Sequence, residues 1–358
     1  MGNVLLFFLL SLLLEGVFAE EVSVKGGDSV TFYTDPKMQE DNMIDWRFGA
    51  QGDLLARIKR KANVTKVFEE VLDWKFKDRL KIDSQTGDLT ITNIMTSDSG
   101  DYEVSNGIGG KKNFKVSVVS DDSVKTVSLV KGYYITLLTG LPDMKRISAI
   151  RWRFKHHNST IAEMKSGNIL IYDDTDKRFK DKLLLNYTTG SLTIADIGTE
   201  HAGDYEVDIS SSGYTIHQSY NVTVATGDFK SLIIEEEGAS VTLQTGTEIM
   251  VSDLIQWRFE DTDLNLNSGL QMDKKTGSLT IINPRRTDSG FYDVKIIRSR
   301  YSIHKEFTVA VYDGGPSGWS SGAVAGIVAC LVAVIAALVI YFWRRITNLQ
   351  AQLSEYCI

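Results

Sequence analysis

The sequence predicts an all-β protein of three tandem β-sandwiches, followed by one membrane-spanning helix. Three observations on this chain of 358 residues support the prediction. A Trp-Arg-Phe motif recurs three times at intervals of about 105 residues, which indicates repeats of similar size. Short runs that alternate apolar and polar residues flank each copy, as half-buried strands do. An uncharged apolar run near the C-terminal end is long enough to cross a bilayer.

Composition and charge narrow the possible functions. With 43% hydrophobic and 24% charged residues, the chain can bury several cores. Its formal net charge of -7 disfavours nucleic acid as a partner, because phosphate binding needs a basic surface. The five histidines form neither a His-Glu-x-x-His motif nor a pair with cysteine, and no glycine-rich phosphate loop is present. We therefore expect no enzyme, no cofactor, no metal and no small-molecule substrate.

The N-terminal segment predicts export. An apolar run extends from Val4 to Leu14, and Val17 and Ala19 have the small side chains that a signal peptidase requires. Residues 1–19 are therefore predicted to be a signal peptide. The alternative is an uncleaved anchor, for which the run is short.

The second apolar run predicts the topology. Residues 322–343 carry no charge, and Arg344 and Arg345 follow directly, which places residues 344–358 in the cytoplasm by the positive-inside rule. We expect a single-pass type I protein of the plasma membrane with an extracellular N-terminus, a stalk at 314–321 and contact with lipid through the span. Gly322, Gly326 and Cys330 form a row of small residues that could also bring two spans together as a homodimer.

Each repeat contains the same elements in the same order. A strand leads to a tryptophan strand, then to a Thr-Gly turn with a further strand, and last to a Gly-x-Tyr strand. The motifs are IDWRF, IRWRF and IQWRF, then TGDLTI and TGSLTI (twice), then DSGDYEV, HAGDYEV and DSGFYDV. The residues expected in the cores are Trp46, Tyr102, Trp152, Tyr205, Trp257 and Tyr292.

This order resembles the immunoglobulin sandwich. In that fold a tryptophan on strand C packs between the sheets, and a tyrosine at the start of strand F bonds back to the corner before it. The resemblance implies variable-type domains at 20–121 and 122–226. It implies a shorter domain at 227–313, where about 20 residues are missing between Trp257 and Tyr292.

The Asp-Ser-Gly triplets at Asp98 and Asp288 raise the alternative of an aspartic protease. Such a protease needs two carboxylates that share a proton, in loops flanked by apolar residues. These triplets instead follow polar turn residues in separate repeats, and the middle repeat has His201 in place of the acid. The sequence therefore favours structural corners.

The cysteines depart from the usual immunoglobulin pattern. The chain has two, Cys330 in the predicted span and Cys357 in the predicted tail, so none can join the two sheets of a sandwich. A disulfide closing a loop of about 70 residues would contribute roughly 4 kcal/mol per domain. Packing around the three tryptophans must offset this loss.

The resemblance also implies an ion pair. In variable-type domains a basic residue at the start of strand D often pairs with the acid of the E–F turn, and Arg79 and Asp98 fit these positions. The second repeat offers Lys182 against His201, and the third offers Gly269 in place of a base. We expect the bridge only in the first repeat.

The first repeat further resembles the SLAM family of leukocyte adhesion receptors. The shared features are a cysteine-free variable-type domain, the strand with Arg79, Leu80 and Asp83, the TGDLTI strand and a single span. The resemblance implies a cell-surface molecule of immune cells. Its distal GFCC′C″ sheet would bind a related immunoglobulin-family receptor in trans, either itself or another protein. The absence of cysteine from the other two repeats departs from the family.

Strand alternation predicts which side chains that sheet presents. Trp46, Tyr102 and Val104 should point inward, so their neighbours point outward. A basic run and the acidic residues after it could make the face self-complementary, whereas the alternative is an ordinary solvated face. The predicted partner-binding residues are Asp45, Arg47, Arg57, Lys59, Arg60, Lys61, Glu103 and Lys115.

Two other functions stay open. The chain could be a signalling receptor that acts through a partner chain or Tyr356, or an adhesion protein outside the immune system. Four Asn-x-Ser/Thr sequons fall in the predicted extracellular part. They are Asn63, Asn158, Asn186 and Asn221.

Overall fold

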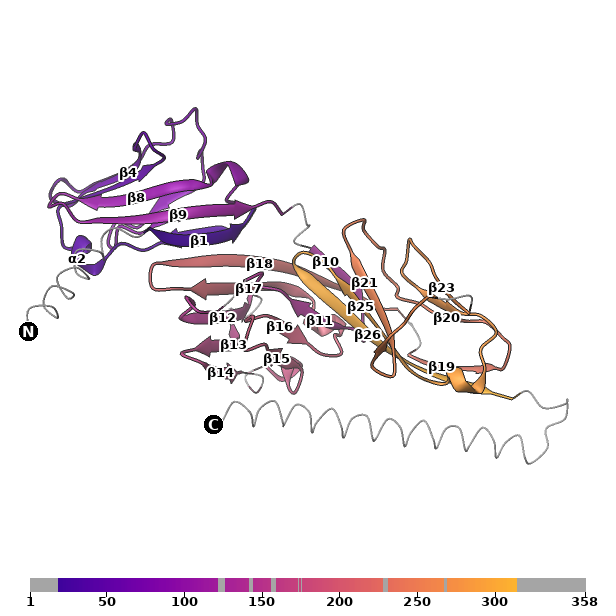
Figure 1. The fold of residues 1–358 in the computed structure, drawn as a ribbon. Helices are drawn as coiled ribbons and strands as arrows, with labels where there is room; N and C mark the ends of the chain where they lie inside the picture. Colours follow the sequence, from indigo (N-terminus) through magenta and orange to yellow (C-terminus); the bar gives the residue numbers. More distant parts are fainter. Residues whose placement is uncertain are drawn as a thin grey trace, which may run out of the picture. The chain divides into compact units, whose positions relative to one another are not determined.

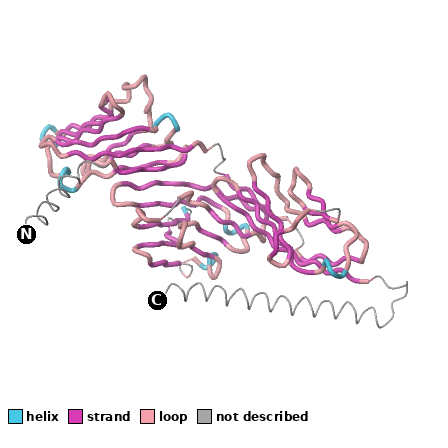
Figure 2. Tube along the Cα trace, in the orientation of Figure 1, coloured by secondary structure: helices cyan, strands magenta, loops and turns pink. Residues whose placement is uncertain are grey.

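The structure is a computed structural model that describes residues 19–121, 126–141, 144–155, 159–172, 174, 176–227, 231–266 and 269–313. The predicted signal peptide up to residue 18, the stalk, the span and the tail lie outside these residues, as does Asn158. Within the described part of the chain, no helix is both long and apolar enough to cross a membrane. Figure 2 shows strands throughout this part, and its helices are single short turns.

The first sandwich packs a six-stranded sheet, in which Figure 1 labels β1, β4, β8 and β9, against a layer of three strands that belongs to a nine-stranded sheet. The six-stranded sheet has the order β1-β9-β8-β3-β4-β5, and β1 runs parallel to β9. Its strands are β1 (Glu20–Lys25), β3 (Met43–Phe48), β4 (Asp53–Lys59), β5 (Val64–Val67), β8 (Gly100–Asn106) and β9 (Lys111–Val119). The smaller layer contains β2 (Ser29–Phe32), β6 (Leu80–Ile82) and β7 (Leu89–Ile91).

An aromatic cluster joins the two layers. Phe32 of β2 lies 6.1 Å from the Trp46 ring and 4.9 Å from the Phe114 ring, between centroids. The Trp46 side chain is fully buried, and its Nε1–H donates to the carbonyl oxygen of Gly87 at 2.7 Å. These contacts occupy the region between the sheets that a disulfide spans in disulfide-bonded immunoglobulin domains.

The second sandwich repeats this arrangement. One layer contains β12 (Ala149–Phe154), β13 (Ser159–Lys165), β14 (Asn168–Ile171), β17 (Gly203–Ser210) and β18 (Tyr214–Ala225). The other strands are β10 (Thr126–Val130), β11 (Tyr134–Leu137), β15 (Leu183–Leu185) and β16 (Leu192–Ile194). Trp152 is fully buried, and its Nε1–H donates to Gly190 at 2.9 Å.

The third sandwich is smaller. One layer contains β21 (Leu254–Phe259), β22 (Thr262–Asp263), β25 (Gly290–Ile297) and β26 (Tyr301–Tyr312), with β19 (Leu232–Glu236) parallel to β26. The other contains β20 (Val241–Leu243), β23 (Leu270–Met272) and β24 (Leu279–Ile281). Trp257 donates to Gly277 at 2.9 Å. Strand β22 has only two residues, in keeping with the shorter span from Trp257 to Tyr292.

Short helical turns connect the strands. They are α2 (Pro36–Gln39), η1 (Arg60–Ala62), η2 (Thr96–Asp98), η4 (Lys177–Phe179), η5 (Thr199–His201) and η6 (Arg286–Asp288). The described chain is all-β, and each sandwich has the topology of an immunoglobulin domain.

The chain forms two compact units. One contains residues up to 128, 136–194 and 200–223, and thus the first sandwich and most of the second; the other contains the rest, including the third sandwich.

Within the first unit, β2 of the first sandwich pairs antiparallel with β18 of the second, and Thr31 lies opposite Thr215. Side chains reinforce this junction, since the Tyr33 hydroxyl bonds Thr215 Oγ1 at 2.7 Å and His217 Nε2 bonds Thr31 Oγ1 at 3.1 Å. One sheet therefore continues through both sandwiches.

Candidate recognition surface

A tyrosine corner fixes the start of β8 and of its counterparts. The Tyr102 hydroxyl donates to the carbonyl oxygen of Asp98 at 2.8 Å, and burial raises the pKa of this tyrosine. Tyr205 donates to His201 at 2.6 Å, and Tyr292 donates to Asp288 at 2.9 Å. The Asp-x-Gly-x-Tyr segments are therefore structural corners.

The ion pair expected between Arg79 and Asp98 is present and buried. Arg79 Nη1 lies 2.5 Å from Asp98 Oδ2, Nη2 lies 3.1 Å from Oδ1, and the Asp98 side chain is 0% exposed. At the same position of the second sandwich, His201 Nε2 contacts the carbonyl oxygen of Arg178 at 2.7 Å. In the third, Asp288 accepts from the backbone N–H of Arg285.

The six-stranded sheet of the first sandwich brings several predicted site residues onto one outer face. Asp45 on β3 lies opposite Arg57 on β4, and Arg47 lies opposite Glu103 on β8. Lys115 on β9 is exposed, whereas its neighbours Phe114 and Val116 are buried. We call this surface, with Lys59 at the end of β4, the distal face.

The centre of the distal face is a cluster of two arginines around one carboxylate. Asp45 accepts from Arg57 Nε and Nη2, both at 2.6 Å, and from Arg47 Nη2 at 3.2 Å. The hydrogen bond to Asp45 raises the pKa of Arg57. The expectation that Asp45 points to solvent is wrong, because the two guanidinium groups cover it and leave it only 4% exposed. The two arginines therefore form the outer surface at this point.

Arg60 has a structural role. Its guanidinium donates to the carbonyl oxygens of Asp41 at 3.0 Å, Ser84 at 3.0 Å and Gln85 at 2.8 Å. These bonds tie the β3–β4 end of the sheet to the turn before β7, so the guanidinium of Arg60 also has structural partners within the sandwich. Lys59 and Lys61 on either side are exposed.

Two exposed residues of this region were missed from the sequence. Lys66 on β5 lies opposite Arg57 and extends the basic strip to the sheet edge. Ile108, in the turn between β8 and β9, is 82% exposed. Period-two alternation along residues 64–67 could have identified Lys66, whereas the turn around Ile108 has no periodic signal.

Glu103, another of the predicted partner-binding residues, forms an ion pair with Lys111 at 3.0 Å.

The sequons in the described residues are all exposed. Asn63 has a left-handed backbone with φ of 51° and lies between η1 and β5, beside the distal face. Asn186 accepts from the backbone of Thr188 in a turn, and Asn221 lies on β18.

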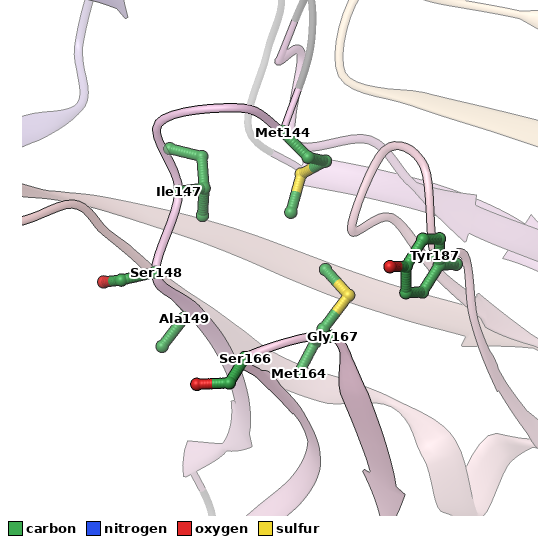
Figure 3. A pocket seen from close by; sticks show the side chains of 8 residues that line it. All are labelled: Met144, Ile147, Ser148, Ala149, Met164, Ser166, Gly167 and Tyr187. Carbon is green, nitrogen blue, oxygen red and sulfur yellow. The ribbon is translucent and has the colours of Figure 1, made fainter.

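A small cavity lies at one end of the second sandwich. It has a volume of about 110 Å³, and Figure 3 shows Met144, Ile147, Met164 and Tyr187 pointing toward a common space. Its lining mixes these side chains with Ser148 and Ser166 and contains no charged side chain.

Among known proteins, only solved structures match this chain. No family model and no curated protein matches the sequence. Extracellular domains 3–5 of Drosophila OTK are 16% identical, with 82% of this chain and 94% of that chain covered and a TM-score of 0.21. Murine CEACAM1b is 18% identical, with 52% and 96% covered and a TM-score of 0.24. The complex of Dpr2 Ig1-Ig2 with DIP-Theta Ig1-Ig3 is 14% identical, with 83% and 98% covered and a TM-score of 0.21.

Proposed function

We propose that this protein is a cell-surface recognition molecule of immune cells. Its distal face binds a related immunoglobulin-family receptor, itself or another, on a facing cell. A SLAM-like type I protein with a signal peptide, one span and glycosylated sequons fits this role. The observation that carries the proposal is the Arg47–Asp45–Arg57 cluster at the centre of an open sheet face.

The cluster suits recognition because its geometry is fixed before a partner arrives. Two hydrogen bonds hold the Arg57 guanidinium flat against Asp45, so little side-chain freedom is lost on binding. Arginine is also enriched at the centres of protein interfaces. The part of the face that meets the partner is thus preorganised.

Charge around the cluster favours a weak, steered encounter. Lys59, Lys61 and Lys66 form a basic strip, while Glu70 and Asp73 are exposed beyond β5. Glu70 Oε1 lies 3.9 Å from Lys66 Nζ, so the basic and acidic groups adjoin. A surface that carries both signs of charge can meet a copy of itself or an acidic partner face, and such complementarity mainly raises the association rate. Adhesion between cells then comes from many weak contacts.

The test reverses the charge of lysines on the distal face that do not hold the sheet together. Full-length Lys59→Glu/Lys66→Glu is compared with Lys81→Glu, an exposed lysine on the opposite layer. Arg57 and Arg60 are left intact because they hold Asp45 and three carbonyls. We expect cells that express the double variant to lose adhesion to one another and to leukocytes, at unchanged surface level, while Lys81→Glu keeps it. Undiminished adhesion by the double variant removes the distal face as the binding site.

A further inference from the structure

Strand β14 is an open, uncharged edge of the second sandwich. Among the described residues its hydrogen-bonded neighbour is β13, and it ends the order of the sheet. Its sequence is Asn-Ile-Leu-Ile, with Ile169 36% and Leu170 53% exposed. Leu184, on the nearby strand β15, is also 53% exposed. Natural proteins usually protect such an edge, since its free N–H and C=O groups invite another strand.

The matching edge of the first sandwich is protected. Lys66 of β5 lies opposite Arg57, as Leu170 of β14 lies opposite Glu163, so the two residues hold the same place in their sheets. A lysine there, with the Asn63 sequon just before the strand, disfavours pairing of β5 with a strand of another chain. In the third sandwich the edge strand β22 has only two residues. Of these three matching edge strands, β14 is the one without a charged residue.

We propose that β14 pairs antiparallel with β14 of a second copy of this chain, across a twofold axis at Leu170. A strand is the occupant that satisfies free backbone groups, and this chain already joins two sandwiches edge to edge through β2 and β18. An identical strand suffices because a twofold contact uses the same surface on both copies. The contact is on the second sandwich, whereas the distal face is on the first, so it shares no residue with the proposed recognition surface.

The hairpin sets the register. Ser166 and Gly167, with φ of 50° and 81°, form a two-residue turn that makes Lys165 and Asn168 a hydrogen-bonded pair. Backbone groups alternate along an antiparallel strand, so those of Ile169 and Ile171 point outward. Pairing of outward groups places Ile169 opposite Ile171 of the second copy and Leu170 opposite its own counterpart.

Charge at the strand ends agrees with this register. Lys165 precedes the hairpin turn and Asp174 follows the strand, so antiparallel pairing about a twofold axis directs the acidic end of one copy toward the basic end of the other. Lys165 and Asp174 are both exposed and of opposite charge. The twofold axis makes this contact twice. Two basic-to-acidic contacts thus flank an apolar centre, whereas a parallel arrangement would bring like charges together.

The test is disulfide trapping in the full-length chain. Cys330→Ser and Cys357→Ser first remove both native thiols. Leu170→Cys then places two thiols on directly opposed residues, and mild oxidation should yield a covalent dimer on non-reducing electrophoresis. Lys81→Cys, exposed on β6 of the first sandwich and outside the distal face, and Leu184→Cys, equally exposed on β15, are the controls and should stay monomeric.

A charge swap tests the register. In the Leu170→Cys chain, Asp174→Lys should lower the dimer yield severalfold, and Lys165→Asp added to it should restore the yield. Equal trapping of Leu170→Cys and Lys81→Cys overturns the proposal. A chain that stays monomeric while the amides of Ile169 and Ile171 resist hydrogen exchange also overturns it, because another partner then covers the edge. Neither result affects the adhesion test of the distal face.

Discussion

Substitution of Arg79 by methionine should destabilise the first sandwich more than any comparable change of a surface arginine. Arg79 makes two hydrogen bonds to Asp98 and donates to the carbonyl oxygens of Lys75 and Asn93. Methionine keeps much of the apolar stem and removes all four bonds. Asp98 then still accepts a hydrogen bond from the backbone N–H of Met95, at 2.9 Å, but its carboxylate is 0% exposed and has lost its cation.

The magnitude follows from the uncompensated charge. Removal of one partner of a buried ion pair costs about 3–5 kcal/mol. Because each 1.4 kcal/mol is a factor of ten, amide exchange in the β8 core should accelerate by roughly a hundredfold to several thousandfold. The matched control is Arg178→Met in the second sandwich. Its partner Asp176 is 16% exposed and Arg178 itself 26%, so the ion pair there contributes only about 1 kcal/mol.

Hydrogen exchange followed by mass spectrometry on the full-length chain measures both variants. The reporter is the segment around Val104, which is fully buried on β8. Arg79→Met/Asp98→Asn removes the stranded charge and should recover much of the lost protection. Acceleration below about tenfold for the single variant, or no recovery in the double one, would refute the reasoning about Asp98.

Two further predictions concern pH. Burial tends to raise the pKa of Asp208, but hydrogen bonds from His217 and Arg153 outweigh it and lower the pKa to about 2. An unfolded aspartate titrates near 3.9, so this stabilisation is complete above about pH 4 and is lost as the pH falls toward 2. Hydrogen exchange of β17 and β18 across this range should show the loss, and Asp208→Asn should abolish the pH dependence; an unchanged profile contradicts the assignment. Burial lowers the pKa of Lys305 to about 8. The unfolded chain then binds more protons between pH 8 and 10, so the third sandwich should become more stable as the pH rises through that range. Lys305→Met should raise its unfolding temperature at pH 7 and flatten the dependence, and a lower temperature would show that the ammonium is needed.

The sequence was sufficient for the fold because its strongest signals are local. Trp46 and Tyr102 each lie in an alternating strand, and alternation determines which side chains point inward. Their burial at 0% and 1% follows from that pattern, as does the inward position of Phe114. The pair Arg79 and Asp98 needed the immunoglobulin resemblance, since 19 residues separate its members.

The surroundings of the distal-face residues were predicted less well. Strand alternation shows on which face of the sheet a side chain lies, but not which side chains lie next to it. It placed Asp45 outward, but only the register of β3 and β4 shows that Arg57 lies opposite and covers it. Arg60 lies in a turn, where periodicity says nothing about direction. The pairing of β2 with β18 joins edges nearly two hundred residues apart, and no pattern within one repeat reveals it.

The shared sheet has a practical consequence for anyone who isolates the first repeat. Strand β2 depends on β18 for the partner along one edge, so a fragment that stops near residue 121 leaves that edge bare. Such a fragment is expected to stick to itself, and its self-association could be mistaken for homophilic recognition. Soluble probes for a counter-receptor should therefore extend at least through Ala225, the last residue of β18.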